Sequence, residues 1–114
     1  MTLDQQLDHA AATIDALFEL YNHTDELTVE TVDGVDTPTS TFFSLANLEY
    51  MIAIVKSLLK DYAKILDQSD ETGFYPKFKL ASTRSAIEHT LDAARLELCS
   101  LRARRQQALE GALL

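Results

Sequence analysis

Residues 45–66 read LANLEYMIAIVKSLLKDYAKIL and form the hydrophobic centre of the sequence. Apolar residues recur in this stretch at alternating spacings of three and four, which is typical of one face of a helix. They are Leu45, Leu48, Ile52, Val55, Leu59, Tyr62 and Leu66. A second apolar stripe beside the first consists of Met51, Ile54, Leu58 and Ile65. At about 100° per residue nearly half of the helix circumference is apolar, so a single neighbouring helix cannot cover it.

Two further stretches, one before and one after this centre, repeat the same periodicity. The first carries Leu3, Leu7, Ala10, Ile14, Leu17 and Tyr21, and the last carries Ile87, Leu91, Ala94, Leu98, Leu101 and Ala108. We expect helices over about residues 3–22, 41–67 and 82–110. The chain of 114 residues has room for one domain. The predicted fold is therefore all-α, a single domain built as a three-helix antiparallel bundle.

The two connections between these helices differ in composition. The first, about residues 23–40, is acidic and contains Val32-Asp33-Gly34-Val35, which matches the Asp-Gly signal of a tight β-hairpin. We expect a long acidic loop there, with or without a small hairpin packed on the helices or on a partner. The second, about residues 68–81, contains Gly73 and Tyr75-Pro76, which disfavour helix, and is predicted to be a loop.

The last helix is predicted to be roughly 40 Å long, at about 1.5 Å per residue. A compact chain of this size has a radius of gyration of only about 13 Å, so the helix would project past the bundle. Either its final turns fray or a second subunit covers them. The central helix is apolar on two sides, which favours coverage by a second subunit over fraying. We therefore expect a homodimer formed through the second and third helices. The predicted interface consists of Leu48, Ile52, Val55, Leu59, Leu91, Leu98 and Leu101.

Charge is distributed unevenly along the chain, whose net charge is −8. Residues 1–55 carry ten acidic residues and no Lys or Arg, whereas residues 56–114 carry eight acidic and ten basic residues. Neutralisation of phosphates by Lys and Arg supplies most non-specific affinity for nucleic acids. Direct nucleic-acid binding is therefore not expected.

Two rows of charge flank the apolar stripes. Asp4, Asp8, Asp15 and Glu19 fall within about 60° of one another on a helical projection of the first helix. Arg84, Arg95 and Arg102 fall within about 20° of one another on the last helix. The rows are complementary. One interpretation is that they orient the helices of a bundle, within a chain or between two chains. The other is that the acidic row binds a basic groove on a target protein.

Aromatic residues cluster near two helix starts. Phe42 and Phe43 are expected to close the end of the core, as a hydrophobic residue before a helix often does. Phe74, Tyr75 and Phe78 lie close to Gly73 and Pro76, together with two lysines. Exposed aromatic residues carry much of the binding energy at protein interfaces, so this second group is the predicted partner-binding cluster.

One short segment resembles a catalytic signature. Arg84-Ser85-Ala86-Ile87-Glu88-His89 has an Arg and a His separated by four residues, and in this it resembles the HEPN ribonucleases, which are small, all-helical and dimeric. The resemblance covers six residues, and Ser85 stands where that family commonly has Asn, Asp or His. It implies that Arg84 and His89 act in RNA cleavage. Residues five apart on a regular helix point about 140° apart, so they would converge only across a dimer seam or at a distorted helix start. If Arg84 and His89 do not converge, His89 is expected to be a solvated surface residue.

No other motif indicates catalysis, and no cofactor or metal site is predicted. The histidines do not have metal-ligand spacing, and the acidic residues of the first connection do not have the spacing of an EF-hand. Three glycines, at 34, 73 and 111, build no phosphate-binding loop.

We therefore expect a cytoplasmic, non-enzymatic regulator that binds another protein and sequesters or inhibits it. An anti-activator of a DNA-binding transcriptional regulator and a phage-type inhibitor are examples of that class, an assignment made by analogy of architecture. The first alternative is a structural subunit or chaperone of a larger phage or secretion assembly. The second is the HEPN-like ribonuclease. No apolar stretch reaches the roughly 20 residues of a membrane span, so a membrane partner is not expected.

Overall fold

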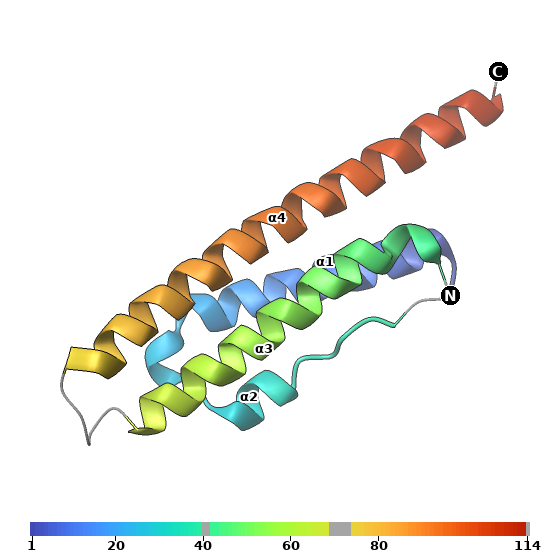
Figure 1. Ribbon diagram of the computed structural model, residues 1–114. Coiled ribbons are helices and arrows are strands. Elements are labelled where there is room, and N and C mark those ends of the chain that lie inside the picture. The colour runs from blue at the N-terminus through green and yellow to red at the C-terminus, as the bar shows by residue number, and fades with distance from the viewer. Residues whose placement is uncertain (40–41, 69–73, 114) are drawn as a thin grey trace.

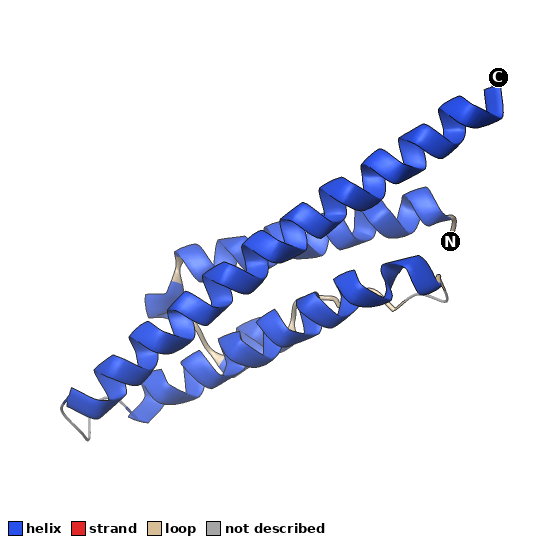
Figure 2. Ribbon diagram, turned by 45° about the horizontal axis from the view of Figure 1, so that its top comes forward, coloured by secondary structure: helices blue, strands red, loops and turns tan. Residues whose placement is uncertain are grey.

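The computed structural model describes residues 1–39, 42–68 and 74–113, with the side chains of residues 74–76 and 113 left out of the description. Every regular element in these ranges is helical, and the predicted all-α class is confirmed (Figure 2). The elements are α1 (Leu3–Asn22), η1 (Thr24–Glu26), α2 (Val29–Asp33), η2 (Phe43–Leu45), α3 (Ala46–Gln68) and α4 (Phe74–Leu113), where η denotes a 3₁₀ helix.

Three long helices lie side by side, and α4 runs opposite to the other two (Figure 1). Helices α1 and α3 run in the same direction, because the chain between them returns along the bundle before α3 begins. The molecule is elongated, with extents of 64 × 22 × 21 Å. The parallel pair follows from the length of the first connection, which is long enough to cross the whole bundle.

The core is organised around α3, whose inward residues are completely buried. Leu48, Ile52, Val55 and Leu59 each have 0% of their surface exposed. Helices α4 and α1 cover α3 from two sides. The first connection covers it further, because α2 also contacts α3 and the connection buries Leu27 and Val32 in the same core. The first apolar stripe of the central helix is therefore covered within one chain, while Met51, Ile54 and Leu58 of the second stripe are half-buried.

The first connection contains a short helix where a long loop, with or without a small hairpin, is expected from the sequence. Helix α2 begins after Thr28, whose hydroxyl oxygen accepts a hydrogen bond from the Thr31 backbone N–H at 3.1 Å. A tight hairpin turn at Asp33-Gly34 requires positive φ angles, but Gly34 has a φ of −69° and ends the helix in a right-handed conformation. The hairpin prediction is therefore wrong. The N-cap at Thr28 stabilises a helix that buries Val32.

Side chains of α1 and α3 hold the returning chain in place. Lys56 Nζ donates hydrogen bonds to the Val35 carbonyl at 2.7 Å and to Thr37 Oγ1 at 3.0 Å. On the other side, the Thr13 hydroxyl donates to the Asp36 carbonyl at 3.0 Å. Residues 35–37 are thus bonded to both parallel helices, which satisfies backbone groups that carry no helical hydrogen bonds.

Helix α4 begins earlier than expected, at Phe74 and not near residue 82. Pro76 was taken as a signal against helix. It lies in the first turn of α4, where backbone N–H groups have no partner within the helix, so a proline is tolerated there. Helix α4 consequently has 40 residues and is about 60 Å long at about 1.5 Å per residue.

We expect Leu27→Ala to destabilise the protein if the first connection is part of the core. Leu27 is 5% exposed, and removal of a buried leucine side chain costs about 2–5 kcal/mol. Leu96→Ala is the matched control, since Leu96 is 72% exposed and its truncation should change stability by less than about 0.5 kcal/mol. Urea unfolding followed by circular dichroism measures both. Equal effects of the two changes would mean that the connection does not cover α3.

A second prediction concerns the ion pair between α2 and α3. Lys60 Nζ lies 2.7 Å from Asp33 Oδ1, and this hydrogen bond lowers the pKa of Asp33 below its ordinary value. Because the folded-state pKa is lowered, the pair stabilises the fold above the ordinary pKa and is lost as the pH falls through the folded pKa. Lys60→Met should return the pKa of Asp33 toward its ordinary value, as measured by carbon NMR of the carboxyl group. Lys77→Met should leave it unchanged, because the lysines whose charges lower the pKa of Asp33 are Lys56, Lys60 and Lys64.

Candidate functional site

At one end of the molecule α4 extends past α1 and α3 (Figure 1). Leu101 is the last residue of α4 that is buried, at 6% exposure. Of residues 102–112, all are exposed except Arg105, which is partly covered. We call this segment, residues 102–112, the α4 extension. It continues the helix without continuing the core.

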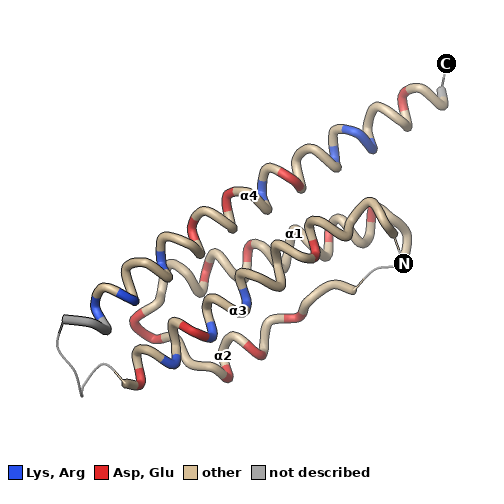
Figure 3. The backbone as a smooth tube through the Cα atoms, viewed as in Figure 1, with Lys and Arg blue, Asp and Glu red and all other residues tan. Residues whose placement is uncertain are grey.

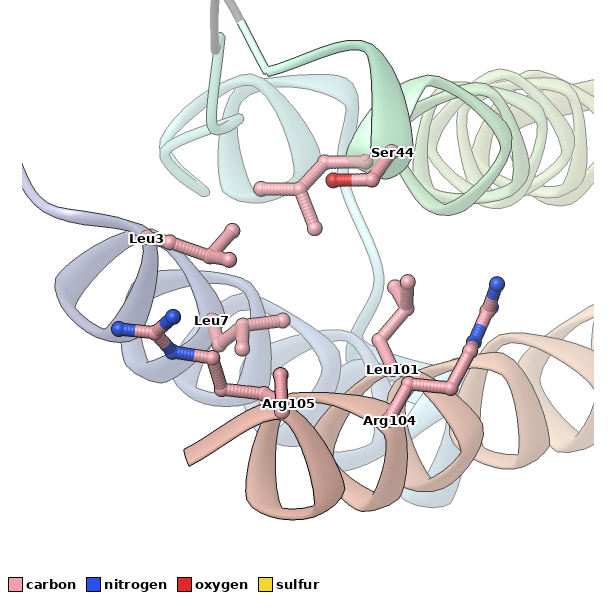
Figure 4. Close-up of a pocket in the computed structure, with 8 residues that line it drawn as sticks. Leu3, Leu7, Ser44, Leu101, Arg104 and Arg105 are labelled. Carbon is pink, nitrogen blue, oxygen red and sulfur yellow. The ribbon is translucent and has the colours of Figure 1, made fainter. Parts of the chain in front are cut away.

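An apolar groove of about 220 Å³ lies between the α4 extension and the ends of the other helices (Figure 4). Three elements form it: the start of α1, the 3₁₀ turn before α3, and two turns of α4. The residues that line it are Leu3, Leu7, Ser44, Leu45, Leu101, Arg104, Arg105 and Ala108. The groove exists because the starts of the parallel helices α1 and α3 lie at the same end, and neither reaches the final turns of α4.

Two arginines flank the groove and extend to opposite sides of it (Figure 4). Arg105 turns toward α1, where its Nε lies 3.2 Å from Asp4 Oδ1. Arg104 extends the other way, and its Nη2 is 3.7 Å from Glu97 Oε1. The Arg104 side chain remains 64% exposed. The groove lining thus combines apolar side chains with two positive charges and contains no carboxylate.

A large aromatic side chain stands next to the groove. Phe43 is 94% exposed, and its neighbour Ser44 lines the groove. The expectation that Phe42 and Phe43 both close the core is therefore wrong for Phe43. Phe42 packs partly against the core, and because the 3₁₀ turn begins at Phe43 the two side chains diverge.

The acidic row of α1 and the arginines of α4 meet within the chain at one end. Asp8 Oδ1 lies 3.1 Å from Arg102 Nη2, beside the Asp4–Arg105 pair. Farther along α1, Glu19 pairs with His23 of the same helix at 3.1 Å. Asp15 is exposed. Of the four acidic residues predicted to bind a partner, Asp4 and Asp8 are thus engaged with α4. Figure 3 shows acidic residues on all four labelled helices, whereas the Lys and Arg residues lie on α3 and α4.

The other two arginines of the row pack on aromatic rings of α1. The guanidinium carbon of Arg95 lies 3.8 Å from the centre of the Phe18 ring, and that of Arg84 lies 4.4 Å from the Tyr21 ring. Arg84 also donates a hydrogen bond to Thr24 Oγ1 at 2.8 Å. The Tyr21 hydroxyl donates to Glu88 at 3.0 Å, and burial together with this bond raises the pKa of Tyr21. These contacts fix α4 against α1.

The residues predicted to form a dimer interface lie inside the single chain. Leu48, Ile52, Val55, Leu59, Leu91, Leu98 and Leu101 are all buried, with exposures of 0–6%. A contact between subunits would need other residues. The reason is that the returning connection and α1 cover the face of α3 that the sequence analysis left for a second subunit. In the predicted aromatic cluster, Phe78 is 64% exposed, while the side chains of Phe74 and Tyr75 lie outside the described residues.

The structure does not bring Arg84 and His89 together within one chain. Both lie on the continuous helix α4, at positions that point about 140° apart. Arg84 is held against Tyr21 and Thr24, while His89 is exposed. Among the described residues no group of three or more His, Cys, Asp or Glu is placed to hold a metal ion. In the same residues, no helix combines the length and apolar character that crossing a membrane requires.

No protein-family model matches the chain, and no curated protein or solved structure is significantly similar to it.

The groove was not predicted from the sequence, because the apolar residues that line it were assigned to the core. Leu3, Leu7 and Leu101 follow the helical periodicity whether or not another helix covers them. One signal was present: the polar run from Arg102 to Gln107 interrupts the apolar stripe, and Ala108 and Leu109 resume it. An apolar stripe that resumes after a polar run indicates a helix that extends past the core of its own chain and is still apolar on one side.

The contacts of Arg84 predict a structural role for this residue. Arg84→Ala should lower the free energy of unfolding by about 1–3 kcal/mol, because it removes a charged hydrogen bond and a cation–π contact. His89→Ala should change it by less than about 0.5 kcal/mol. Urea unfolding measures both. RNA cleavage by the unaltered protein that is lost in both variants, with their folds intact, would instead favour the ribonuclease.

Proposed function

We propose that the protein is a non-enzymatic regulator that binds another protein through the open end of its bundle. One observation carries this proposal: the apolar groove flanked by Arg104 and Arg105, next to the exposed ring of Phe43. Apolar side chains in a pocket, with charged groups at the edge, are the usual anatomy of a protein-binding surface. The packing of α1, α3 and α4 positions the residues that line the groove.

The size and chemistry of the groove favour a protein ligand over a small substrate. Its volume of about 220 Å³ is below the roughly 300–1,000 Å³ typical of small-molecule sites. Ser44, Arg104 and Arg105 are its polar lining residues, and none of them is a carboxylate, histidine or cysteine that would act as a general base. An anchor side chain of a partner would fill such a groove.

Sequestration is the form of regulation that this surface supports best. A regulator that binds a helical surface of its target prevents that surface from pairing or from reaching DNA. The net charge of −8 supports a mechanism in which the protein occupies its target and does not bind nucleic acid itself.

A second candidate is a subunit or chaperone of a larger assembly, and it is favoured by the exposed apolar residues outside the groove. Phe78 and Leu96 of α4 are 64% and 72% exposed. The homodimer expected for the regulator stays a prediction, and exposed side chains such as these could also take part in it. An assembly subunit should self-associate without its partner, whereas a sequestering regulator need not.

The proposal is tested by placing a carboxylate in the groove. Ala108 lines the groove and is exposed, so Ala108→Glu should abolish partner binding without disturbing the core. Ala103→Glu is the matched control, because Ala103 is exposed on the same helix but does not line the groove. Affinity capture from the native cell lysate measures both. A partner retained by the unaltered protein and by the Ala103 variant, and lost from the Ala108 variant, is the expected result. Retention by all three would contradict the proposal.

A further inference from the structure

Resting on this proposed function, we infer that the groove binds an acidic amphipathic helix of the partner protein. The partner helix lies along the α4 extension, places an apolar side chain between Leu7 and Leu101, and presents carboxylates to Arg104 and Arg105. The shape and the charge of the groove determine this chemistry.

The shape of the groove fits a helix. Its lining residues on α4 run from Leu101 to Ala108, which is two helical turns or about 10 Å. Those on α1, Leu3 and Leu7, are one turn apart. Two helix edges with an apolar floor form the kind of groove in which an amphipathic helix places residues at i, i+3, i+4 and i+7. The described residues contain no strand, so they offer no sheet edge for an extended peptide.

The charge of the groove favours an acidic ligand. Arg104 is the more available cation, with 64% of its side chain exposed and its contact to Glu97 at 3.7 Å. Arg105 is partly satisfied by Asp4, on the side of the groove next to α1. The groove lining itself contains no carboxylate, and Asp4 and Glu97 contact the two arginines from outside it. Arg104 thus presents a largely solvent-exposed cation at the edge of an apolar groove, where a carboxylate of a partner can pair with it.

The same charges oppose a second copy of this chain in the groove. A two-fold contact brings the same surface of both subunits together. A two-fold axis close to Arg104 would bring Arg102, Arg104 and Arg105 of one copy near the same three residues of the other, with Glu110 as the acidic residue of each extension. Like charges in contact disfavour an interface. A partner with carboxylates beside its apolar stripe does not meet this repulsion.

The test uses two designed peptides of about 18 residues, long enough to form a helix. Both carry the same leucine stripe, with glutamates flanking it in one peptide and lysines in the other. Fluorescence anisotropy measures their binding to the full chain. We expect the glutamate peptide to bind about tenfold more tightly or better. The preference for the glutamate peptide should be lost in Arg104→Glu. It should persist in Arg104→Lys, which keeps the positive charge. It should also persist in Lys77→Glu, which reverses a charge as Arg104→Glu does, but at the other end of α4.

The outcomes separate this inference from the proposed function. If both peptides bind equally well and both are lost with Ala108→Glu, the groove binds helices but the acidic preference is wrong. If neither peptide binds, the inference is overturned, while lysate capture with the Ala108 and Ala103 variants still decides the proposed function. If light scattering shows a dimer that Ala108→Glu dissociates, a second copy occupies the groove and the inference is likewise overturned.

Discussion

The apolar circumference of α3 has to be covered from more than one side, and the rest of the structure depends on this requirement. Burial of each large apolar side chain contributes about 1.5–3 kcal/mol, and four inward residues of α3 have no exposed surface. Helix α4 covers one side, α1 another, and the connection through α2 adds to them. Because that connection runs back along the bundle, α1 and α3 are parallel, and both begin at the same end.

The open end of the bundle is a consequence of this topology. Helix α4 is 40 residues long, whereas α3 has 23 and α1 has 20, so α4 extends past both of their starts. Two ion pairs, Asp4–Arg105 and Asp8–Arg102, lie where α4 leaves the core. Exposed pairs of this kind contribute only about 0.2–1 kcal/mol each. Their main effect is to fix the orientation of the helix, which keeps the groove residues on its inner side.

Helix periodicity was enough to predict the all-α class, and the predicted and observed first helices both cover residues 3–22. It was not enough to predict how the central helix is covered. Leu27 and Val32 lie in a polar, acidic segment without a long periodic pattern, so their burial depends on tertiary contacts that local spacing does not contain. The same reason explains why the residues predicted for a dimer interface are buried within the single chain. The start of α4 was missed because Pro76 was read as a helix breaker, although a first turn tolerates proline. The groove was missed because periodicity identifies an apolar face but not whether anything covers it.

The central claim is that one chain forms an elongated bundle whose last helix leaves an open, ligand-accessible end. Small-angle X-ray scattering coupled to size-exclusion chromatography tests it most directly, because it reports mass and shape together. The account predicts a monomer with a radius of gyration near 16.6 Å. A monomer with a radius near the roughly 13 Å of a compact chain of this length, or a dimer in which the α4 extensions are buried, would contradict it.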